Sequence, residues 1–592
     1  MKINSLKAII LALPLSLMMS CLEFDTPSDE FTGAEEEVEP EVFHGKADEI
    51  NYKKAITEEG FTKAQNNLKT FFRQVPTASY YIRGGKNGAM PQEHQYQYVY
   101  NLHIDNYAGY LCADQNFGGR MPSTYSYNYD FCDGPYGSFL EVKNNLVNML
   151  NHPDIDSIPE VKAIGLLLYN FSAQEMVDIY GSIPYVDHKN NVETNPFEFN
   201  KGMDIYATIV DNVDTIVACF DHFKERPQWY KTKVNNLLNT VDVITMDKSI
   251  DSWKRFANSL KLRMAMHSVK ALPEKARKWA EEAVASGVVE TTDQEIALNW
   301  ITGCFYHPLH TIANSWSDTR LNASFESLLM SLDHPFAKYF FTNNLAPITN
   351  TATGKVLPAD NRIVGLRAGL VMVSGQSTDV NPRCAYSSLA TDYIMDAPLY
   401  YIKVSEMDFL RAEGALRGWS MGGTPQFFYE RGICNAQVEG RYDEERQMYA
   451  EYVDQYMKLD KAIAYTYVDP MDDANNIASV TTIGVKWNES DDRETKLEKI
   501  ITQKYLSLFP YSNEAWTEMR RTGYPKLFPV LNAADYGDGS LNDGDLIRRM
   551  PLPGRGTTVG LDDINTSGID AIGGNDVQAT RVWWDIDGIG NF

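Results

Sequence analysis

A pair of glutamates in the second half of the chain is the first candidate for chemistry. Glu406 and Glu413 are seven residues apart in a segment with helical spacing, so they lie on one face of the expected helix. Two carboxylates could act as the acid and base of a glycoside hydrolase, but catalytic carboxyl groups are ~5–9.5 Å apart. Seven helical residues separate the two backbones by about 10.5 Å. A buried carboxylate also needs a cation, which Arg520 or Arg521 could supply. We therefore interpret the pair as structural.

Three further patterns suggest catalysis or metal binding but lack a necessary part. Gly418-Trp-Ser-Met-Gly422 fits the GxSxG pattern of a hydrolase, but a helix is expected before it and no histidine follows it. His307 and His310 could be two metal ligands, but Pro308 disfavours the helix that would align them, and no acidic third ligand has suitable spacing. The acidic loop at 535–545 could chelate calcium, yet it lacks EF-hand spacing. We predict no enzyme activity, cofactor or metal site, with calcium left open.

An aromatic segment is the better candidate for binding. Residues 96–139 hold nine tyrosines and three phenylalanines, about twice the average aromatic density of the chain. Flat aromatic faces with polar neighbours suit a sugar ring or an extended peptide. Alternating tyrosines would lie on one face of an extended segment, so we predict that the ligand contacts Tyr125, Tyr127, Tyr129, Asn116 and Arg120. The alternative, expected for more than half of the tyrosines, is packing against helices.

Helical hairpins are expected to position these residues. Apolar side chains recur at three- and four-residue steps over 253–267, which predicts an amphipathic helix that Ser252 or Asp251 could cap. A second helix is predicted between Pro273 and Gly287. The same two-helix unit recurs at 158–180 with 203–223, 401–417 with 425–436, and 496–508 with 513–520.

These uneven hairpins resemble tetratricopeptide repeats. Long loops with short strands are expected between them, at 76–140, 288–400 and 530–592. The predicted fold class is therefore mostly α, with a helix-hairpin scaffold, long loop-rich insertions and a few short strands.

The first fifty residues indicate export and attachment to a membrane. Lys2 and Lys7 precede an apolar run that ends at Cys21, and about 12 apolar residues make a secretory signal and not a permanent span of ~20. The position of Cys21 resembles a bacterial lipobox, although Met18 replaces the usual leucine, so we expect Cys21 to be acylated. Residues 22–50 carry eleven acids against one base, which predicts an extended tether. The predicted parts are a signal peptide at 1–20, a lipidated tether at 21–50 and one domain at 51–592.

Charge and cysteine usage exclude other classes of protein. A formal net charge of −25 argues against a nucleic-acid partner and against electrostatic docking on anionic lipid, so only the acyl chains would hold the membrane. The seven cysteines are scattered without CxxC or zinc-like spacing. We expect mostly buried free thiols, with Cys112 and Cys132 as the one pair to test for a disulfide.

Eight segments together carry a family resemblance. They are QEMVDIYGSIPY at 174–185, WKRFANSLKLRMAM at 253–266, VSEMDFLRAEGALRG at 404–418, FYERGI at 428–433, IITQKYLSLF at 500–509, EAWTEMRRTGYP at 514–525, RRMPLP at 548–553 and WWD at 583–585. In this order they resemble the SusD/RagB family of outer-membrane nutrient-binding lipoproteins, in its SusD-like type 2 branch. The chain departs from the family at LPGRGT, where a Tyr-Pro pair with an acid and asparagines is common, and at an insertion over 349–382.

The resemblance implies a cell-surface protein of Bacteroidetes that binds oligosaccharide or peptide nutrients. It would be lipid-anchored in the outer membrane, facing the exterior, and would deliver its ligand to a SusC-like TonB-dependent transporter. The family also implies a contribution to the site from the middle of the chain, here Tyr306 to Arg320, including Asn314 and Trp316. The alternatives are a secreted glycoside hydrolase and a repeat scaffold that binds only protein partners. The sequence does not name the ligand.

Overall fold

The described part of the chain is helical and lacks a membrane-spanning segment. The computed structural model describes residues 39–84, 93–114, 125, 131–298, 306–335, 337–344, 348–349, 356–357, 361–370, 385–436, 452–554 and 564–592. The chain divides into Met1–Pro40 and a compact unit, Glu41–Phe592. The predicted signal peptide and Cys21 lie outside the described residues. Among the described helices, none is both long and apolar enough to cross a membrane.

The compact unit begins inside the segment predicted as a tether. The backbone N–H of Glu41 donates to Asp204 Oδ1 at 2.9 Å, and that of Phe43 donates to Thr208 Oγ1 at 3.0 Å. Asp48 is buried and forms an ion pair with Lys189. Residues 41–50 therefore pack on the helices, and the folded unit starts before the predicted start at residue 51.

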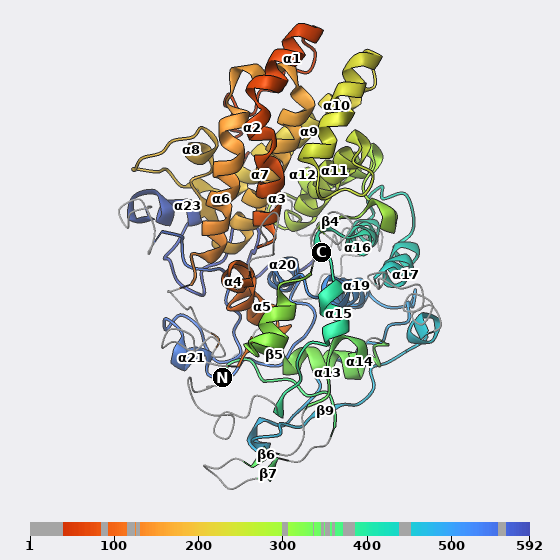
Figure 1. The fold of residues 1–592 in the computed structure, drawn as a ribbon. Coiled ribbons are helices and arrows are strands. Elements are labelled where there is room, and N and C mark those ends of the chain that lie inside the picture. The colour runs from red at the N-terminus through yellow and green to blue at the C-terminus, as the bar shows by residue number, and fades with distance from the viewer. Residues whose placement is uncertain are drawn as a thin grey trace, which may run out of the picture. The chain divides into compact units, whose positions relative to one another are not determined.

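Four predicted helix pairs are present. They are α7 (Pro159–Tyr180) with α9 (Gly202–Phe223), α11 (Ile250–His267) with α12 (Pro273–Ser286), α16 (Val404–Leu416) with α17 (Pro425–Asn435), and α19 (Arg493–Leu508) with α20 (Ser512–Thr522). In Figure 1, α6 (Gly134–Leu150), α7, α9, α11 and α12 lie side by side, orange to yellow-green. The prediction of a mostly α, helix-hairpin scaffold is confirmed.

The ends of these helices follow from the local sequence. Ser249 caps α11, because its hydroxyl accepts a hydrogen bond from the backbone N–H of Ser252 at 3.1 Å. The cap therefore precedes both predicted candidates. Pro273 occupies the first turn of α12, and Gly287 ends it with a φ of 104°. Both features match the prediction, because proline fits a first helical turn and glycine tolerates a positive φ.

Several helices lie where loops were predicted. α3 (Gln74–Ile82) packs on α6, and α13 (Ala323–Ser331) lies in the long middle segment. Pro76 and Pro135 lie in the segment predicted as a loop, yet each stands in the first turn of its helix. Proline is tolerated there because the first backbone N–H groups have no partner within the helix.

Short two-stranded sheets connect distant parts of the chain. β1 (Leu111–Ala113) pairs antiparallel with β5 (Thr319–Leu321), so that Cys112 faces Arg320. This sheet joins the aromatic segment to the middle segment. The other pairs are β2 (Ser182–Ile183) with β3 (Asn200–Lys201), β4 (Ile296–Leu298) with β8 (Leu399–Ile402), β6 (Ile348–Thr349) with β7 (Val356–Leu357), and β9 (Thr466–Tyr467) with β10 (Ile477–Ala478).

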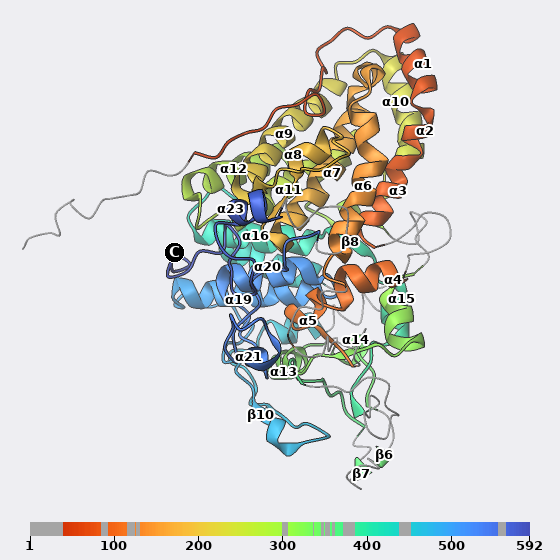
Figure 2. The same ribbon diagram turned by 90° about the vertical axis from the view of Figure 1, so that its left-hand side faces the viewer.

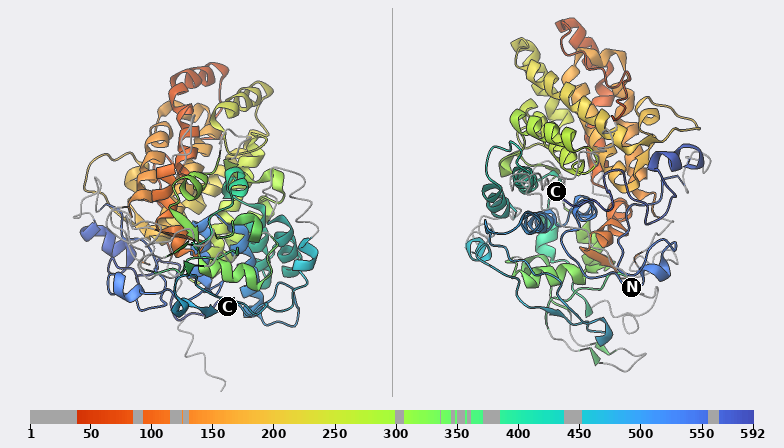
Figure 3. Two further views of the ribbon diagram at one scale, coloured as in Figure 1. Left: turned by 60° about the horizontal axis from the view of Figure 1, so that its bottom comes forward. Right: turned by 180° about the vertical axis from the view of Figure 1, so that it is seen from behind.

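The end of the chain returns to the central helix. The indole N–H of the fully buried Trp584 donates to Asp178 Oδ1 on α7 at 2.8 Å. The backbone N–H of Met550 donates to the carbonyl of Ile179, also at 2.8 Å. Figure 3 shows the C-terminal segments (blue) beside helices from the first half of the chain. The two cysteines of the predicted test pair, Cys112 and Cys132, are both buried and do not form a disulfide.

Candidate ligand-binding site

The two glutamates that suggested a hydrolase each form an ion pair with an arginine. Arg263 holds Glu406 through two hydrogen bonds of 2.6 and 2.8 Å. Arg521 holds Glu413 in the same way, at 2.8 and 2.6 Å. All four side chains are buried, and a bidentate pair leaves neither carboxylate available to protonate a substrate. The predicted role of Arg521 is confirmed, whereas Arg520 binds backbone carbonyls and lies over the Trp516 ring.

The residues of the other sequence patterns take part in local structure. Gly418 and Gly422 have φ values of 84° and 85° and form the turn after α16, as predicted. His307 is buried, its Nδ1 accepts a hydrogen bond from the backbone of Leu309, and burial lowers its pKa to about 3. In the acidic loop, Asp538 accepts hydrogen bonds from the backbone N–H groups of Ser540 and Gln578.

One charged cluster was not predicted from the sequence. His267, Glu514 and Glu518 bring a nitrogen and two carboxylates together in the core, in a geometry that could hold a metal ion. The ammonium of Lys504 lies 2.7 Å from Glu514 and 3.3 Å from Glu518. Arg521 also lies 2.6 Å from Glu518. Because these two cations already neutralise the two carboxylates and would repel a metal ion, the cluster is a buried ion-pair network.

Four aromatic rings from three segments form a row on the surface. The Trp316 ring stacks on His94, with centroids 4.5 Å apart and planes inclined by 26°. His94 also stacks with Tyr98 at 6.0 Å, and Tyr98 stacks on Phe131 at 4.8 Å. His94 is exposed and the other three rings are half-buried. We call these four residues the aromatic row.

Local helical geometry explains which rings face outward. His94 lies on α4 (Glu93–Tyr96) and Tyr98 on the π-helical turn η2 (Gln97–Asn101) that continues it. Four-residue spacing puts these two rings on one side of the helix. Tyr96 and Tyr100, two residues out of step, face the interior and are buried. This spacing is the one signal in the sequence that could have revealed the outward pair.

The segment that carries Trp316 is held against this helix. Glu93 accepts hydrogen bonds from the hydroxyls of Tyr306 at 2.9 Å and Thr311 at 3.4 Å. Gln97 donates to Asp318 Oδ2 at 3.0 Å. Trp316 follows a second π-helical turn, η5 (Thr311–Ser315), and precedes Ser317, which has a φ of 57°. Such turns and positive φ values in non-glycine residues are common at functional sites.

The predicted site residues have different positions. Trp316 belongs to the aromatic row, and half-buried Asn314 accepts a hydrogen bond from Ser388 at 3.5 Å. Arg320 is buried and pairs with Asp114 at 2.9 Å. Tyr125 is also buried, and its hydroxyl accepts a hydrogen bond from the backbone N–H of Ile547. The remaining predicted residues lie outside the described part of the chain: Asn116, Arg120, Tyr127 and Tyr129.

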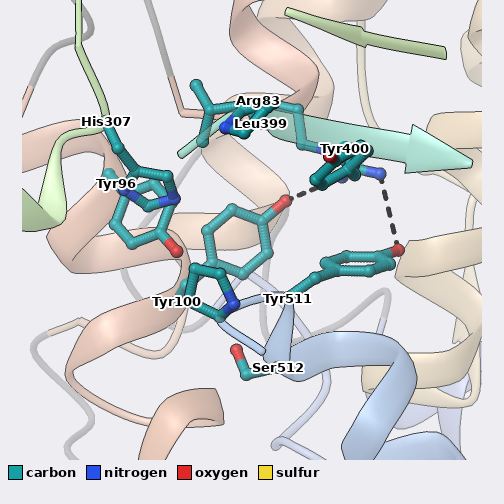
Figure 4. A pocket seen from close by; sticks show the side chains of 10 residues that line it. Arg83, Tyr96, Tyr100, His307, Leu399, Tyr400, Tyr511 and Ser512 are labelled. Carbon is teal, nitrogen blue, oxygen red and sulfur yellow. Dashed lines mark hydrogen bonds between the residues drawn. The ribbon is translucent and has the colours of Figure 1, made fainter. Parts of the chain in front are cut away.

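The cavity behind the aromatic row is too small for a sugar. It is lined by Arg83, His307 and the inward rings of Tyr96, Tyr100 and Tyr511 (Figure 4). The guanidinium of Arg83 donates to the hydroxyls of Tyr100 and Tyr511, at 3.1 and 3.4 Å. The cavity has room for about one water molecule. A ligand of this region would therefore bind on the exposed side, at the aromatic row.

Comparisons with known proteins agree with this architecture. A family model described as "Susd and RagB outer membrane lipoprotein" matches residues 49–585. A chitin-binding SusD homologue from Flavobacterium johnsoniae is 28% identical, with a TM-score of 0.72, and the match covers 90% of this chain and 100% of that one. A SusD homologue from Bacteroides ovatus is 27% identical, with a TM-score of 0.70 over 87% of this chain and 99% of that one. No curated protein matches. The chain belongs to the SusD/RagB family of outer-membrane lipoproteins.

Proposed function

We propose that this protein binds glycans at the aromatic row and delivers them to a SusC-like TonB-dependent transporter in the outer membrane. The single observation that carries the binding role is the row itself, a set of exposed and half-buried rings held in place by Glu93 and Gln97. Aromatic faces take up the apolar faces of sugar rings, and polar neighbours set their orientation. The chitin-binding neighbour supports a glycan over a peptide.

Within the site, we assign different roles to the predicted residues. Trp316 would contact the ligand, because its ring is the half-buried end of the aromatic row. Arg320 and Asn314 would act by positioning, since Arg320 is buried against Asp114 and Asn314 is held by Ser388. Tyr125 would support the aromatic segment from within the core. Ligand contacts by Asn116, Arg120, Tyr127 and Tyr129 stay predictions.

The binding role is tested by isothermal titration with chitohexaose and a matched peptide panel. The protein would be the chain from residue 22 on, which keeps the whole compact unit. We expect binding without cleavage, weakened at least tenfold by Trp316→Ala. Trp229→Ala is the control, because Trp229 is also half-buried but lies on α10 (Gln228–Val241) against Phe61. Equal losses in both variants would count against the aromatic row, and cleavage of any glycan would favour the hydrolase alternative.

Attachment and delivery are tested in cells. We propose that Cys21 is acylated after the signal peptide is removed, and that the acidic tether lets the domain face the exterior. Cys21→Ala should release the protein from the membrane fraction, and protease added to intact cells should digest the wild type. Co-purification with a TonB-dependent transporter is expected from the wild type. If the protein purifies without one, delivery is wrong even where glycan binding is present.

A further inference from the structure

A second groove lies at the corner between α13 and α14 (Ala337–Phe340). Residues 452–460 form its other wall, and its volume is about 760 Å³. Ligand sites commonly measure about 300–1,000 Å³, so this groove is large enough for an oligosaccharide, unlike the water-sized cavity behind the aromatic row. In Figure 2, α14 and α4 lie on the same side of the molecule, as does the intervening α15 (Thr391–Asp396).

The floor of the groove is buried and hydrogen-bonded, and its upper walls carry aromatic side chains. Tyr456 is 5% exposed, donates to Gln503 at 3.0 Å and packs edge-on against the buried His334. Tyr339 is half-buried, with its ring edge-on to Tyr393. Tyr452, by contrast, is 54% exposed. A preformed floor beneath an exposed aromatic face is the usual construction of a site that stacks a ring.

The rim carries hydrogen-bonding groups that the protein does not use. Asp333, Lys338, Gln455 and Lys458 line the groove and are exposed, and none of these side chains has a hydrogen bond or ion pair within the described part of the chain. Asp333 also has a φ of 49°, uncommon for a residue other than glycine. Such uncommitted donors and acceptors can bind a ligand without breaking contacts that stabilise the fold.

The charges of the groove favour a neutral ligand. Its lining contains two lysines and two aspartates, the second being Asp460, which lies 3.8 Å from Lys486. His334 does not add a charge near neutral pH, because burial lowers its pKa to about 3. The net charge of −25 repels a polyanion at long range, and the equal numbers of lysines and aspartates leave the lining without a net charge that would attract an ion of either sign. The lining comes from helix ends and turns, not from a strand edge that could pair with an extended peptide.

We propose that this groove is a second glycan-binding site, which takes a neutral oligosaccharide. Sugar rings stack on Tyr452 and Tyr339, and their hydroxyls bond with Lys338, Gln455 and Lys458. This inference rests on the proposed function for the class of ligand, but it concerns a different place on the molecule. Two sites on one side would hold a long glycan at two points and raise its overall affinity through effective concentration.

The test is a titration of the chain from residue 22 on with chitohexaose, maltohexaose and cellohexaose. We expect two hexamers per chain for at least one glycan, and one per chain for Tyr452→Ala. Phe427→Ala is the matched control, because Phe427 is 51% exposed and lies on α17. High salt should leave the affinity of the groove unchanged within twofold, because the ligand is neutral.

Each outcome separates the groove from the aromatic row. If Tyr452→Ala binds as many hexamers per chain as the wild type, the groove is not a glycan site. This holds even if Trp316→Ala abolishes binding and so supports the aromatic row. Loss of one site with Tyr452→Ala supports the groove, even if Trp316→Ala has no effect and so contradicts the row. Absence of binding to all three hexamers overturns the groove. A tenfold loss of the groove's affinity in high salt would overturn the assignment of a neutral ligand.

Discussion

The buried pair of Arg521 and Glu413 allows a quantitative prediction. Arg521 gives two hydrogen bonds to Glu413 and lies against Glu518, with all three side chains fully buried. Arg521→Met removes the cation and leaves two carboxylates in the core, a change that costs about 3–5 kcal/mol when one partner of a buried pair is lost. Each carboxylate keeps a second cation, Arg417 at 2.8 Å and Lys504 at 3.3 Å. We therefore expect the lower end, about 3 kcal/mol.

A double-mutant cycle measures the pair itself. We expect Glu413→Leu alone to cost about 3 kcal/mol, and the double variant Arg521→Met/Glu413→Leu to cost at least 1.5 kcal/mol less than the sum, because replacing both charges removes the desolvation penalty. Urea unfolding at pH 7, followed by tryptophan fluorescence, gives the three free energies of unfolding. Single variants within 0.5 kcal/mol of the wild type, or a strictly additive double variant, would refute the assignment of a buried ion pair. Glycan binding should be unchanged in Glu413→Leu.

The pH dependence of Glu413 has a definite sign. Burial would raise its pKa, but Arg521 and Arg417 outweigh burial and hold the pKa below the usual value. A carboxylate with a lowered pKa stabilises the folded state above the pKa of the unfolded chain and loses that contribution as the pH falls. The wild type should therefore lose more stability than Glu413→Leu between pH 5 and pH 3.

Four further predictions concern the site and two buried groups. Tyr98→Ala should weaken chitohexaose binding at least fivefold in calorimetry with an unchanged melting temperature, because Tyr98 is a half-buried ring of the aromatic row; an unchanged affinity would remove it from the site. Glu93→Gln should weaken binding less, because Glu93 only holds the Trp316 segment, and a larger loss than with Tyr98→Ala would contradict this positioning role. Burial raises the pKa of Glu326 to about 7, so the folded state keeps a proton that the unfolded chain releases near pH 4.5. The free energy of unfolding should therefore fall by up to about 3 kcal/mol between pH 4.5 and 8. The same fall with pH in Glu326→Gln would refute this assignment. Burial lowers the pKa of His334 to about 3, so stability should fall as the pH drops from about 6.5 toward 3, with a smaller fall in His334→Asn if the assignment is right.

Periodicity predicted the scaffold well and failed where local signals were ambiguous. The spacing over 253–267 is sufficient because α11 buries a continuous apolar face. α6 was missed, since its first residues are Gly134 and Pro135 and its neighbours are rich in tyrosine. The composition of such a segment predicts a loop, whereas tertiary packing against α3 and α7 stabilises it as a helix.

The aromatic row was predicted only in part because it joins segments that are distant in sequence. The family resemblance supplied Trp316, and aromatic density supplied the first segment. Neither showed that Trp316 stacks on His94, because that contact depends on the β1–β5 pairing and on Glu93. Tyr125 belonged to the predicted set through strand-like alternation, yet it is buried, with its ring edge-on to that of Tyr107. Alternation marks which residues share a face and does not show whether that face meets solvent.

The segments that identify the family are those that build its core. Glu413, Arg263 and Glu514 all lie within them, and all belong to the buried ion-pair network. The aromatic row and Tyr452 lie outside every one of these segments. The similarity to a chitin-binding protein at 28% identity therefore indicates a shared scaffold. The choice of ligand depends on residues outside the segments that build this scaffold. For this reason the decisive variants are Trp316→Ala and Tyr452→Ala, which change the two candidate surfaces and leave the core charges in place.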